Sequence, residues 1–396
     1  MDRADVRQAG AEAVASLSGD EEGMAKLVAA AGLLLPALCT ILARHADEPQ
    51  AAAAAAAALV NISVDAAAAR QAVEAGLVET AAAHILSDDA DVSERCAMLL
   101  ANLTNPQHAG SKGTSRLIGS AHLSSVLSAF DSDASSHVSF LLGALTHVLS
   151  SDEGRAAILT HPSAARLLAR LCSLLAPRSP HMQAAAMAVR NLGFAARPGA
   201  AGQAALVSLV CADGADVVSR LALPLAPHDT GEKATGCLYE QEEVLAFSHT
   251  LRAAIQPEET RPSDDELASP AVREADVAAG IAALDHTPGH ATRLALLEAL
   301  LLLSAAPAVC EAMRREGIFP VLRESRAMML LAEDEAHRPA IDANESLVSI
   351  FHLASGGQTV PSEPGQPRGK FVWELEDEAR KAGGPEPREA REEVED

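Results

Sequence analysis

The stretch Ala97–Thr104, "AMLLANLT", decides the fold because related stretches occur on both sides of it. "AAAALVNIS" ends at Ser63 and "AMAVRNLGF" ends at Phe194, and each places an Asn near the end of an apolar run with helical spacing. From Asn61 to Asn102 is 41 residues. A period in the low forties without strand signals is typical of armadillo and HEAT helical repeats.

A weaker copy, "LLGALTHVLS", lies between the second and third copies. It places Ala144, 42 residues after Asn102, where the other copies have Asn, and Asn191 follows 47 residues later. We therefore align Asn61, Asn102, Ala144 and Asn191 as one repeated position. In the central copy, Cys96, Met98, Leu99 and Leu103 have the spacing of one helical face, and we expect them to pack in the core.

A second pair of related stretches marks the bends between helices. "VAAAGLLLPALCTIL" begins at Val28 and "AVEAGLVETAAAHIL" at Ala72, so that Gly32 and Gly76 correspond. Glycine at a bend predicts a positive φ. Asp47, Asp65, Asp91 and Ser151 precede helical stretches and are expected to cap them. The expected caps therefore mark where one helix ends and the next begins.

Composition favours the same fold class. The chain has 396 residues, of which 48% are apolar but only 2% aromatic. Alanine and leucine favour closely packed helices, whereas a β-sandwich or barrel uses β-branched and aromatic residues. We predict an all-α, armadillo/HEAT-like α-solenoid, a right-handed superhelix of helical repeats with a disordered acidic C-terminal tail.

The repeat pattern is interrupted, which predicts four segments. Residues 1–228 form N-terminal armadillo-like repeats, and 229–275 form an irregular acidic insertion with some helix. Residues 276–353 return to armadillo-like helices. Residues 354–396, which include Trp373, are rich in Pro, Gly and acidic residues, a composition that favours disorder.

Charge and cysteine content indicate the compartment and exclude some partners. The 54 acidic and 31 basic residues give a net charge of −23, which repels nucleic acid and anionic membranes. The first twenty residues contain no long apolar block, so no secretory signal is predicted. The six cysteines are at least 26 residues apart, as expected for reduced thiols. We expect a cytoplasmic monomer that binds neither nucleic acid nor membranes.

Three stretches fit the N-x-[ST] glycosylation pattern, beginning at Asn61, Asn102 and Asn344. Because a cytoplasmic protein is not N-glycosylated, we interpret the three matches as coincidental.

Catalytic and metal-binding motifs are absent from the sequence. There is no GxSxG elbow, phosphate-binding GxxxxGK[ST] loop, GxGxxG or HExxH. The acidic stretch Ser87–Glu94 lacks the spacing of an EF-hand and is better explained as a loop that caps a helix. We predict a protein that is not an enzyme, with no catalytic residues, no cofactor and no metal.

The repeated asparagines are the candidate binding site. In an armadillo repeat this segment is the last helix, which lines the concave face, so Asn61, Asn102 and Asn191 would form a ladder along it. Two interpretations stay open. The amides could bind the backbone of a partner, because they carry both a donor and an acceptor, or they could join adjacent repeats.

Nuclear-import armadillo receptors have a Trp four residues before the ladder Asn, where it clamps a Lys by cation–π contact. Here those positions are Ala57, Met98 and Met187. The clamps are missing, which argues against import-type recognition and predicts a plain acidic groove.

Over roughly residues 25–353 the chain resembles the Hgh family, armadillo-like eukaryotic proteins that assist the folding of translation elongation factor 2. The segments that carry the resemblance are "CAMLLANLTNPQ", "FLLGALTHVLSSDEGRAAIL", "MQAAAMAVRNLGF", "SRLALPLAPHD" and "RLALLEALLLLSAAPAVCEAMRREGIFPVLRESR". Val277–Arg293 departs from the family pattern, which has an LQYL-containing run there.

The resemblance implies an adaptor that brings the cytosolic chaperonin and associated chaperones to newly made elongation factor 2, without a cofactor. The alternative is a generic armadillo protein-interaction scaffold for another cytosolic complex.

Overall fold

The computed structural model describes residues 3–132, 137–176, 179–212, 215–225, 288–316 and 335–354, together with four single residues between 317 and 334. All regular structure in these residues is helical. The predicted insertion, 229–275, and the predicted tail beyond residue 354 lie outside the described residues. The predicted all-α solenoid is confirmed for the described part of the chain.

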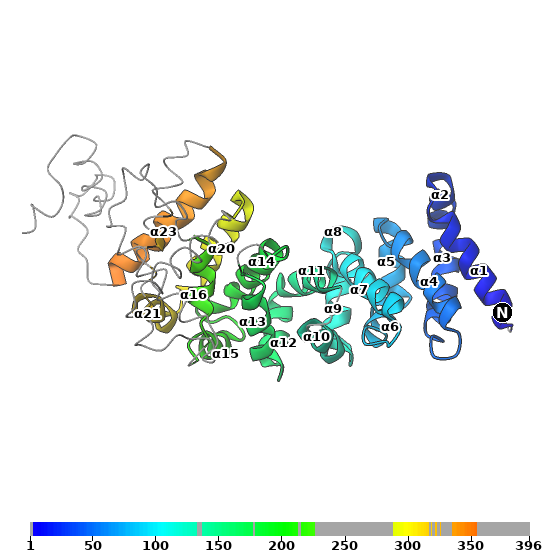
Figure 1. Ribbon diagram of the computed structural model, residues 1–396, viewed down its shortest axis with the longest axis horizontal. Coiled ribbons are helices and arrows are strands. Elements are labelled where there is room, and N and C mark those ends of the chain that lie inside the picture. Colours follow the sequence, from blue (N-terminus) through cyan, green and yellow to red (C-terminus); the bar gives the residue numbers. More distant parts are fainter. Residues whose placement is uncertain are drawn as a thin grey trace, which may run out of the picture.

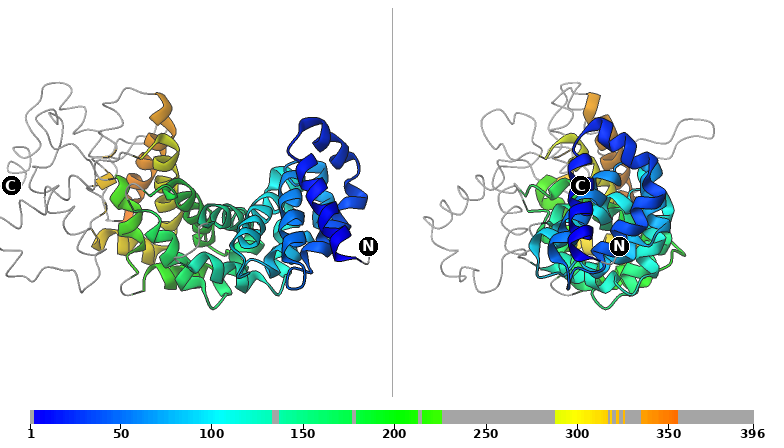
Figure 2. Two further views of the ribbon diagram at one scale, coloured as in Figure 1. Left: turned by 45° about the vertical axis from the view of Figure 1, so that its right-hand side comes forward. Right: turned by 90° about the vertical axis from the view of Figure 1, so that its right-hand side faces the viewer.

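Seven helices follow one another in a row, and each packs on the next. We call them the inner helices: α1 (Ala4–Leu17), α4 (Pro49–Ile62), α7 (Ala90–Thr104), α11 (Val138–Leu149), α14 (Met182–Gly193), α20 (His290–Leu303) and α23 (Arg338–Ala354). Figure 2 shows the described helices as an arch whose N-terminal and C-terminal helices rise on the same side, with α11 and α14 on the inner side of the bend. We call this inner side the concave face.

Further helices pack against the inner helices and complete the repeats labelled in Figure 1. The first helix of each repeat is α2 (Glu21–Ala29), α5 (Ala66–Glu74), α9 (Ser111–Gly119) or α12 (Asp152–Thr160). The second is α3 (Ala31–Leu42), α6 (Leu77–Ala83), α10 (Leu123–Asp131) or α13 (Ala164–Ser173). The remaining described elements are α8 (Pro106–Ala109), η1 (Phe194–Ala196), α15 (Gln203–Val210), α16 (Val217–Ala222), η2 (Leu223–Leu225), α21 (Pro307–Arg315) and η4 (Glu335–His337).

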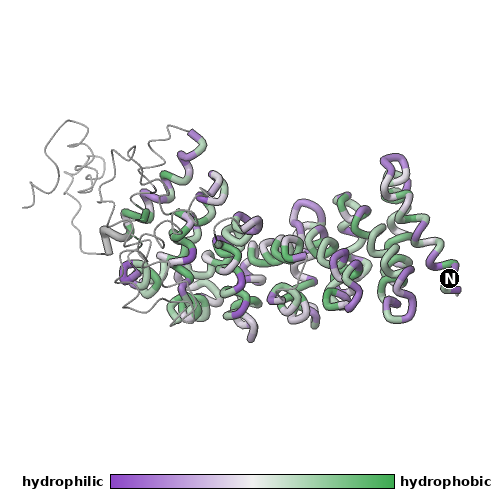
Figure 3. The backbone as a smooth tube through the Cα atoms, viewed as in Figure 1, coloured by the Kyte–Doolittle hydropathy of each residue, from purple (hydrophilic) through white to green (hydrophobic). Residues whose placement is uncertain are grey.

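The inner helices pack closely because small and aliphatic residues face their neighbours. Figure 3 shows hydrophobic stretches along α7, α11 and α14. In α4, the alanine run 51–58 combines strong helix propensity with minimal bulk, and five of its eight side chains are buried. In α7, Cys96, Leu99 and Leu103 are fully buried as predicted, but Met98 is only partly buried and lies on the exposed side of the helix. The prediction that Met98 is a core residue is therefore wrong.

The C-terminal helices continue the same row across a long segment of sequence. α20 packs directly on α14, and Arg190 forms an ion pair with Glu298 although the two residues are 108 positions apart. A Cβ built on Gly193 would lie 3.0 Å from the Cβ of Leu302, so the two helices approach closely at this point. The described parts of segments 1–228 and 276–353 thus belong to one stack of helices.

Helix ends follow the expected chemistry, with shifts of position. Gly76 has a φ of 86° and precedes α6, as predicted, whereas Gly32 lies inside α3 and is not a bend. The side chains of Asp65 and Ser151 cap α5 and α12 as predicted. Asp89 caps α7, two residues before the predicted Asp91. Asp47 was also misplaced, because Glu48 is the residue that precedes α4, and its side chain makes no capping bond.

In three of the four repeats, the first helix touches the end of the preceding inner helix at a glycine, whereas α5 has Ala68 at the corresponding position. A Cβ added to Gly113 in α9 would lie 1.7 Å from the carbonyl oxygen of Leu103, and one added to Gly154 in α12 would lie 2.0 Å from that of Val148. Gly23 in α2 has the same relation to Leu17. Real Cβ atoms do not approach carbonyl oxygens this closely, so only glycine fits. The sequence signal is a glycine at the third position of the helix.

Candidate functional site: the ladder of the concave face

The predicted ladder asparagines lie near the C-terminal ends of three inner helices. Asn61 is in α4, Asn102 in α7 and Asn191 in α14, and each side chain is half-buried. The buried residues of α4, α7 and α14 occupy the other sides of these helices, and we therefore assign the three side chains to the concave face. The structure therefore places all three at equivalent positions of the stack.

Each ladder amide donates a hydrogen bond to the preceding repeat. Asn61 Nδ2 donates to Ser18 Oγ (2.8 Å), and Asn102 Nδ2 donates to Ser63 Oγ (3.0 Å). Asn191 Nδ2 donates to the carbonyl oxygen of Thr146 (3.0 Å). The amide nitrogens thus join adjacent repeats, as in the second of the two interpretations.

The accepting hydroxyl is itself part of a relay. Ser18 Oγ donates to the Ala15 carbonyl (2.7 Å), and Ser63 Oγ donates to the Val60 carbonyl (2.8 Å). These carbonyl groups belong to the last turn of an inner helix, where carbonyl oxygens have no hydrogen-bond partner within the helix. One hydroxyl therefore satisfies its own helix end and accepts the amide of the next repeat. We call this pair of bonds the hydroxyl relay.

Ala144 does not occupy the ladder position assigned to it. Its side chain is 0% exposed, so it belongs to the core. The position is filled by His147, whose Nδ1 lies 3.2 Å from Thr104 Oγ1, while Thr104 Oγ1 donates to the Leu100 carbonyl (2.6 Å). The alignment of "GALT" with "ANLT" concealed this. The spacing to the next helix cap identifies His147 as the ladder residue. Asn61 lies four residues before the cap Asp65, and His147 lies four residues before the cap Ser151.

The hydroxyl relay also explains two of the three N-x-[ST] matches. In Asn61-Ile62-Ser63 and Asn102-Leu103-Thr104, the Asn bonds to the preceding repeat and the hydroxyl two residues later accepts a bond from the next. The packing of the repeats therefore accounts for the pattern at these two places. Asn344 differs: it is fully buried in α23 and its Nδ2 donates to the Leu322 carbonyl.

What remains for a partner is the acceptor side of the ladder. Among the described residues, no donor reaches the Oδ1 atom of Asn61 or Asn102, and that of Asn191 lies 3.4 Å from a nitrogen of Arg190. An Asn carbonyl oxygen can accept a hydrogen bond from a peptide N–H group. The ladder can therefore still contact an extended backbone, but through acceptors rather than through complete amides.

Charges on the concave face largely cancel. Arg95 lies 4.0 Å from Asp91 and donates to the Ala53 carbonyl (2.6 Å), while Arg190 is paired with Glu298. α4 and α11 contain no Asp, Glu, Lys or Arg, and the remaining charged residues of the inner helices from α4 to α20, Glu94 in α7 and Arg293 in α20, are one acid and one base. The predicted acidic groove is therefore wrong for the described inner helices from α4 to α20.

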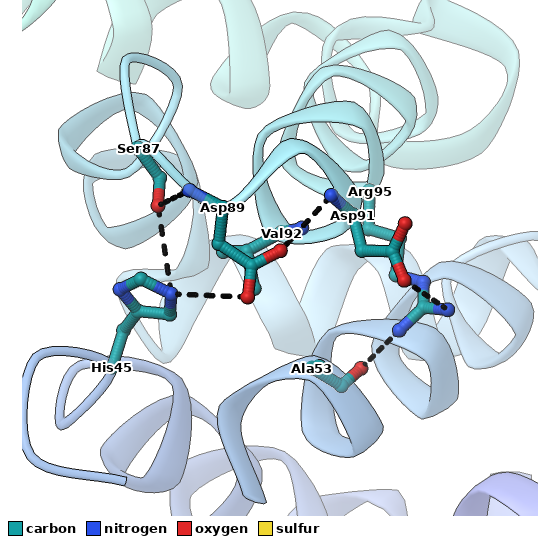
Figure 4. A network of polar contacts seen from close by, with 7 residues as sticks. All are labelled: His45, Ala53, Ser87, Asp89, Asp91, Val92 and Arg95. Atoms are coloured by element: carbon teal, nitrogen blue, oxygen red, sulfur yellow. Dashed lines mark hydrogen bonds and ion pairs between the residues drawn. The ribbon is translucent and has the colours of Figure 1, made fainter. Parts of the chain in front are cut away.

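A cluster of His45, Ser87 and Asp89 brings together the residue types of a catalytic triad (Figure 4). Ser87 Oγ and Asp89 Oδ2 both approach the same nitrogen, His45 Nε2, at 3.5 and 3.7 Å. A triad needs the carboxylate on the opposite ring nitrogen, where it orients the base. Asp89 Oδ1 instead accepts the backbone N–H groups of Asp91 and Val92. The cluster is a helix cap that joins two repeats.

No three His, Cys, Asp or Glu side chains of the described chain lie close enough together to hold a metal ion. None of the described helices could cross a membrane alone. Two bent pairs, α2 with α3 and α20 with α21, reach that length and composition together. Burial raises the pKa of the Cys96 and Cys172 thiols to about 12, which keeps both protonated and unreactive.

Stability is expected to fall below about pH 6.5, where histidine in an unfolded chain begins to take up protons. Burial lowers the pKa of His84, His137 and His147, so the folded chain resists this protonation. The unfolded state then binds more protons than the folded state, and acid favours unfolding. Thermal unfolding at about pH 7.5 and about pH 5.5 should give a lower midpoint in acid.

His147→Asn tests the contribution of the ladder histidine. Asparagine can still donate to Thr104 Oγ1 but cannot titrate, so the difference between the two midpoints should shrink. A difference as large as that of the wild type would show that His147 contributes nothing to the acid sensitivity.

Comparison with known proteins bears on the fold. No protein-family model and no curated protein matches the sequence. A designed armadillo repeat protein of known structure is 13% identical, with a TM-score of 0.51, and the alignment covers 80% of this chain and 99% of that one. A second, solved with the peptide (KR)4, is 14% identical with the same coverage and TM-score. An engineered protein is 16% identical over 81% of this chain and 97% of its own, with a TM-score of 0.51. The chain is thus an armadillo-like solenoid in fold.

Proposed function

We propose that this protein is a non-enzymatic folding adaptor that holds a client polypeptide on its concave face. The client is newly made translation elongation factor 2, which the adaptor links to the cytosolic chaperonin and associated chaperones in the cytoplasm. The armadillo-like fold supports protein binding in general. The choice of client rests on the resemblance carried by segments such as "CAMLLANLTNPQ" and "MQAAAMAVRNLGF".

The observation that carries the proposal is the continuous row of inner helices from α4 to α20. Figure 2 shows these helices as an arch, and their C-terminal halves carry a repeated set of half-buried residues. A row of equivalent positions suits an extended polypeptide, whose own side chains repeat at regular distances. The alternative function, a generic scaffold for another complex, uses the same face with a different partner.

Affinity capture from cytosol distinguishes the two functions. The tagged protein should recover elongation factor 2 and chaperonin subunits, identified by mass spectrometry, and purified elongation factor 2 should bind directly. Recovery of a different complex, without elongation factor 2, would favour the generic scaffold and reject the proposed client.

A paired substitution tests whether the concave face is the client site. Ser139 in α11 and Gln183 in α14 are exposed there, so Ser139→Arg with Gln183→Arg should block capture without unfolding the chain. The matched control, Ser128→Arg with Ala169→Arg, changes exposed residues of α10 and α13, the helices behind α11 and α14. Equal loss of capture in both variants would place the client elsewhere.

A further inference from the structure

A second column of side chains lies one helical turn before the ladder. The residues four positions before Asn61, Asn102, His147 and Asn191 share a face with them because side chains four apart on a helix are neighbours. They are Ala57, Met98, Gly143 and Met187. The column therefore alternates small and large residues along the concave face, and we call it the methionine column.

The methionines of this column are accessible. Met187 is 42% exposed, and Met98 is partly buried against the core. The small residues of the column leave space beside the methionines. A Cβ built on Gly143 would meet nothing nearer than the Ala101 Cβ at 4.0 Å. Methionine is unbranched, flexible and polarizable, so it adapts to apolar side chains of different shapes.

Charge supports an uncharged occupant of this column. The arginines that flank it, Arg95 and Arg190, are each paired with a carboxylate of the same face, Asp91 and Glu298. No aromatic clamp occupies the four positions of the column. A Lys- or Arg-rich peptide would find one acidic residue outside these pairs, Glu94, and no cation–π partner here.

We propose that the concave face binds an extended segment with large apolar side chains, two of which contact Met98 and Met187. This inference rests on the proposed function as a client-binding adaptor and specifies the chemistry of the client segment. The segment runs across the inner helices, and its peptide N–H groups can reach Oδ1 of Asn61 and Asn102. Recognition is then by backbone and apolar contact.

The helix spacing sets the distance between the two apolar anchors. Packed helices lie about 8–10 Å apart, so Met98 on α7 and Met187 on α14, with α11 between them, are separated by about 16–20 Å. An extended chain advances about 3.3 Å per residue, and every second side chain points to the same side. The two anchors should therefore be about six residues apart.

Fluorescence anisotropy with synthetic peptides tests this chemistry. The first probe is a labelled Ser/Gly peptide with two leucines about six positions apart. The second has the leucines about three apart, which puts them on opposite sides of an extended chain. The third is the basic peptide (KR)4. We expect the first probe to bind at least about tenfold more tightly than either of the others.

Substitution of the methionines completes the test. Met98→Gln with Met187→Gln keeps length and helix propensity but replaces the thioethers with amides, and should weaken binding of the first probe by about tenfold or more. The matched control is Leu33→Gln, which removes a side chain that is 84% exposed on α3, and should leave binding unchanged. An unchanged thermal midpoint would show that each variant is folded.

Two results would overturn the inference: tighter binding of (KR)4 than of the first probe, or undiminished binding of the first probe to the methionine variant. Failure of the proposed function looks different. If elongation factor 2 is not captured while the spaced leucine peptide binds through Met98 and Met187, the client is wrong and the inference on its chemistry stands.

Discussion

Among Gly→Ala substitutions in the described part of the chain, Gly113→Ala is expected to destabilise the protein most. The added Cβ would lie 1.7 Å from the Leu103 oxygen and 2.8 Å from the Leu103 carbonyl carbon. These are backbone atoms of α7, which cannot rotate away as a side chain would. Overpacking of a core typically costs about 1–3 kcal/mol, and a backbone clash of this size should reach or exceed the upper value. Urea denaturation gives the change in the free energy of unfolding.

Gly119→Ala is the matched control because Gly119 lies in the same helix, α9. A Cβ there meets nothing within 4 Å, so the substitution should be neutral or stabilise the helix by about 0.5–1 kcal/mol. If Gly113→Ala were as stable as Gly119→Ala, α9 would not approach the end of α7 as closely as the structure shows.

Leu99→Ala should cost about 2–5 kcal/mol, the range for truncating a buried leucine. Leu99 is fully buried in α7, which packs on α4 and α11, so its loss leaves a cavity between repeats. Met98→Ala, at the next residue but on the exposed side of the same helix, should change stability far less. Because a solenoid is held by contacts between neighbouring repeats, hydrogen exchange should accelerate in α4 and α11 before it does in α20.

A loss well under about 1 kcal/mol for Leu99→Ala would show that the site is not part of a packed core. A uniform increase of exchange along the whole chain would instead contradict nearest-neighbour coupling and indicate a single cooperative unit.

The fold could be predicted from sequence because its signal is repeated. The stretches around Asn61, Asn102 and Asn191 share the same order of apolar residues and Asn, and equivalent positions of the stack share the same environment. Individual positions were less predictable. His147 replaces Asn in the ladder because both can donate to a hydroxyl, and a search for identical residues does not detect that equivalence.

Burial was predicted least well where spacing alone was used. Met98 is adjacent to the fully buried Leu99 and Ala97, yet it faces outward, because apolar residues occupy both sides of α7. The glycine contacts were missed for a different reason. Gly113 and Gly154 are separated by ordinary helical sequence, and only three-dimensional contact with the preceding helix shows why no other residue fits.

The contact between α14 and α20 has a consequence for synthesis of the chain. Arg190 and Gly193 in α14 contact Glu298 and Leu302 in α20. The ribosome makes these contact residues about a hundred residues later, since Arg190 and Glu298 are 108 residues apart. At about 5–20 residues per second, a ribosome needs roughly 5–20 s to supply it. During that interval the growing chain presents the side of α14 that later packs on α20. A protein that we propose to assist the folding of another chain therefore itself passes through a state in which α14 lacks its packing partner α20.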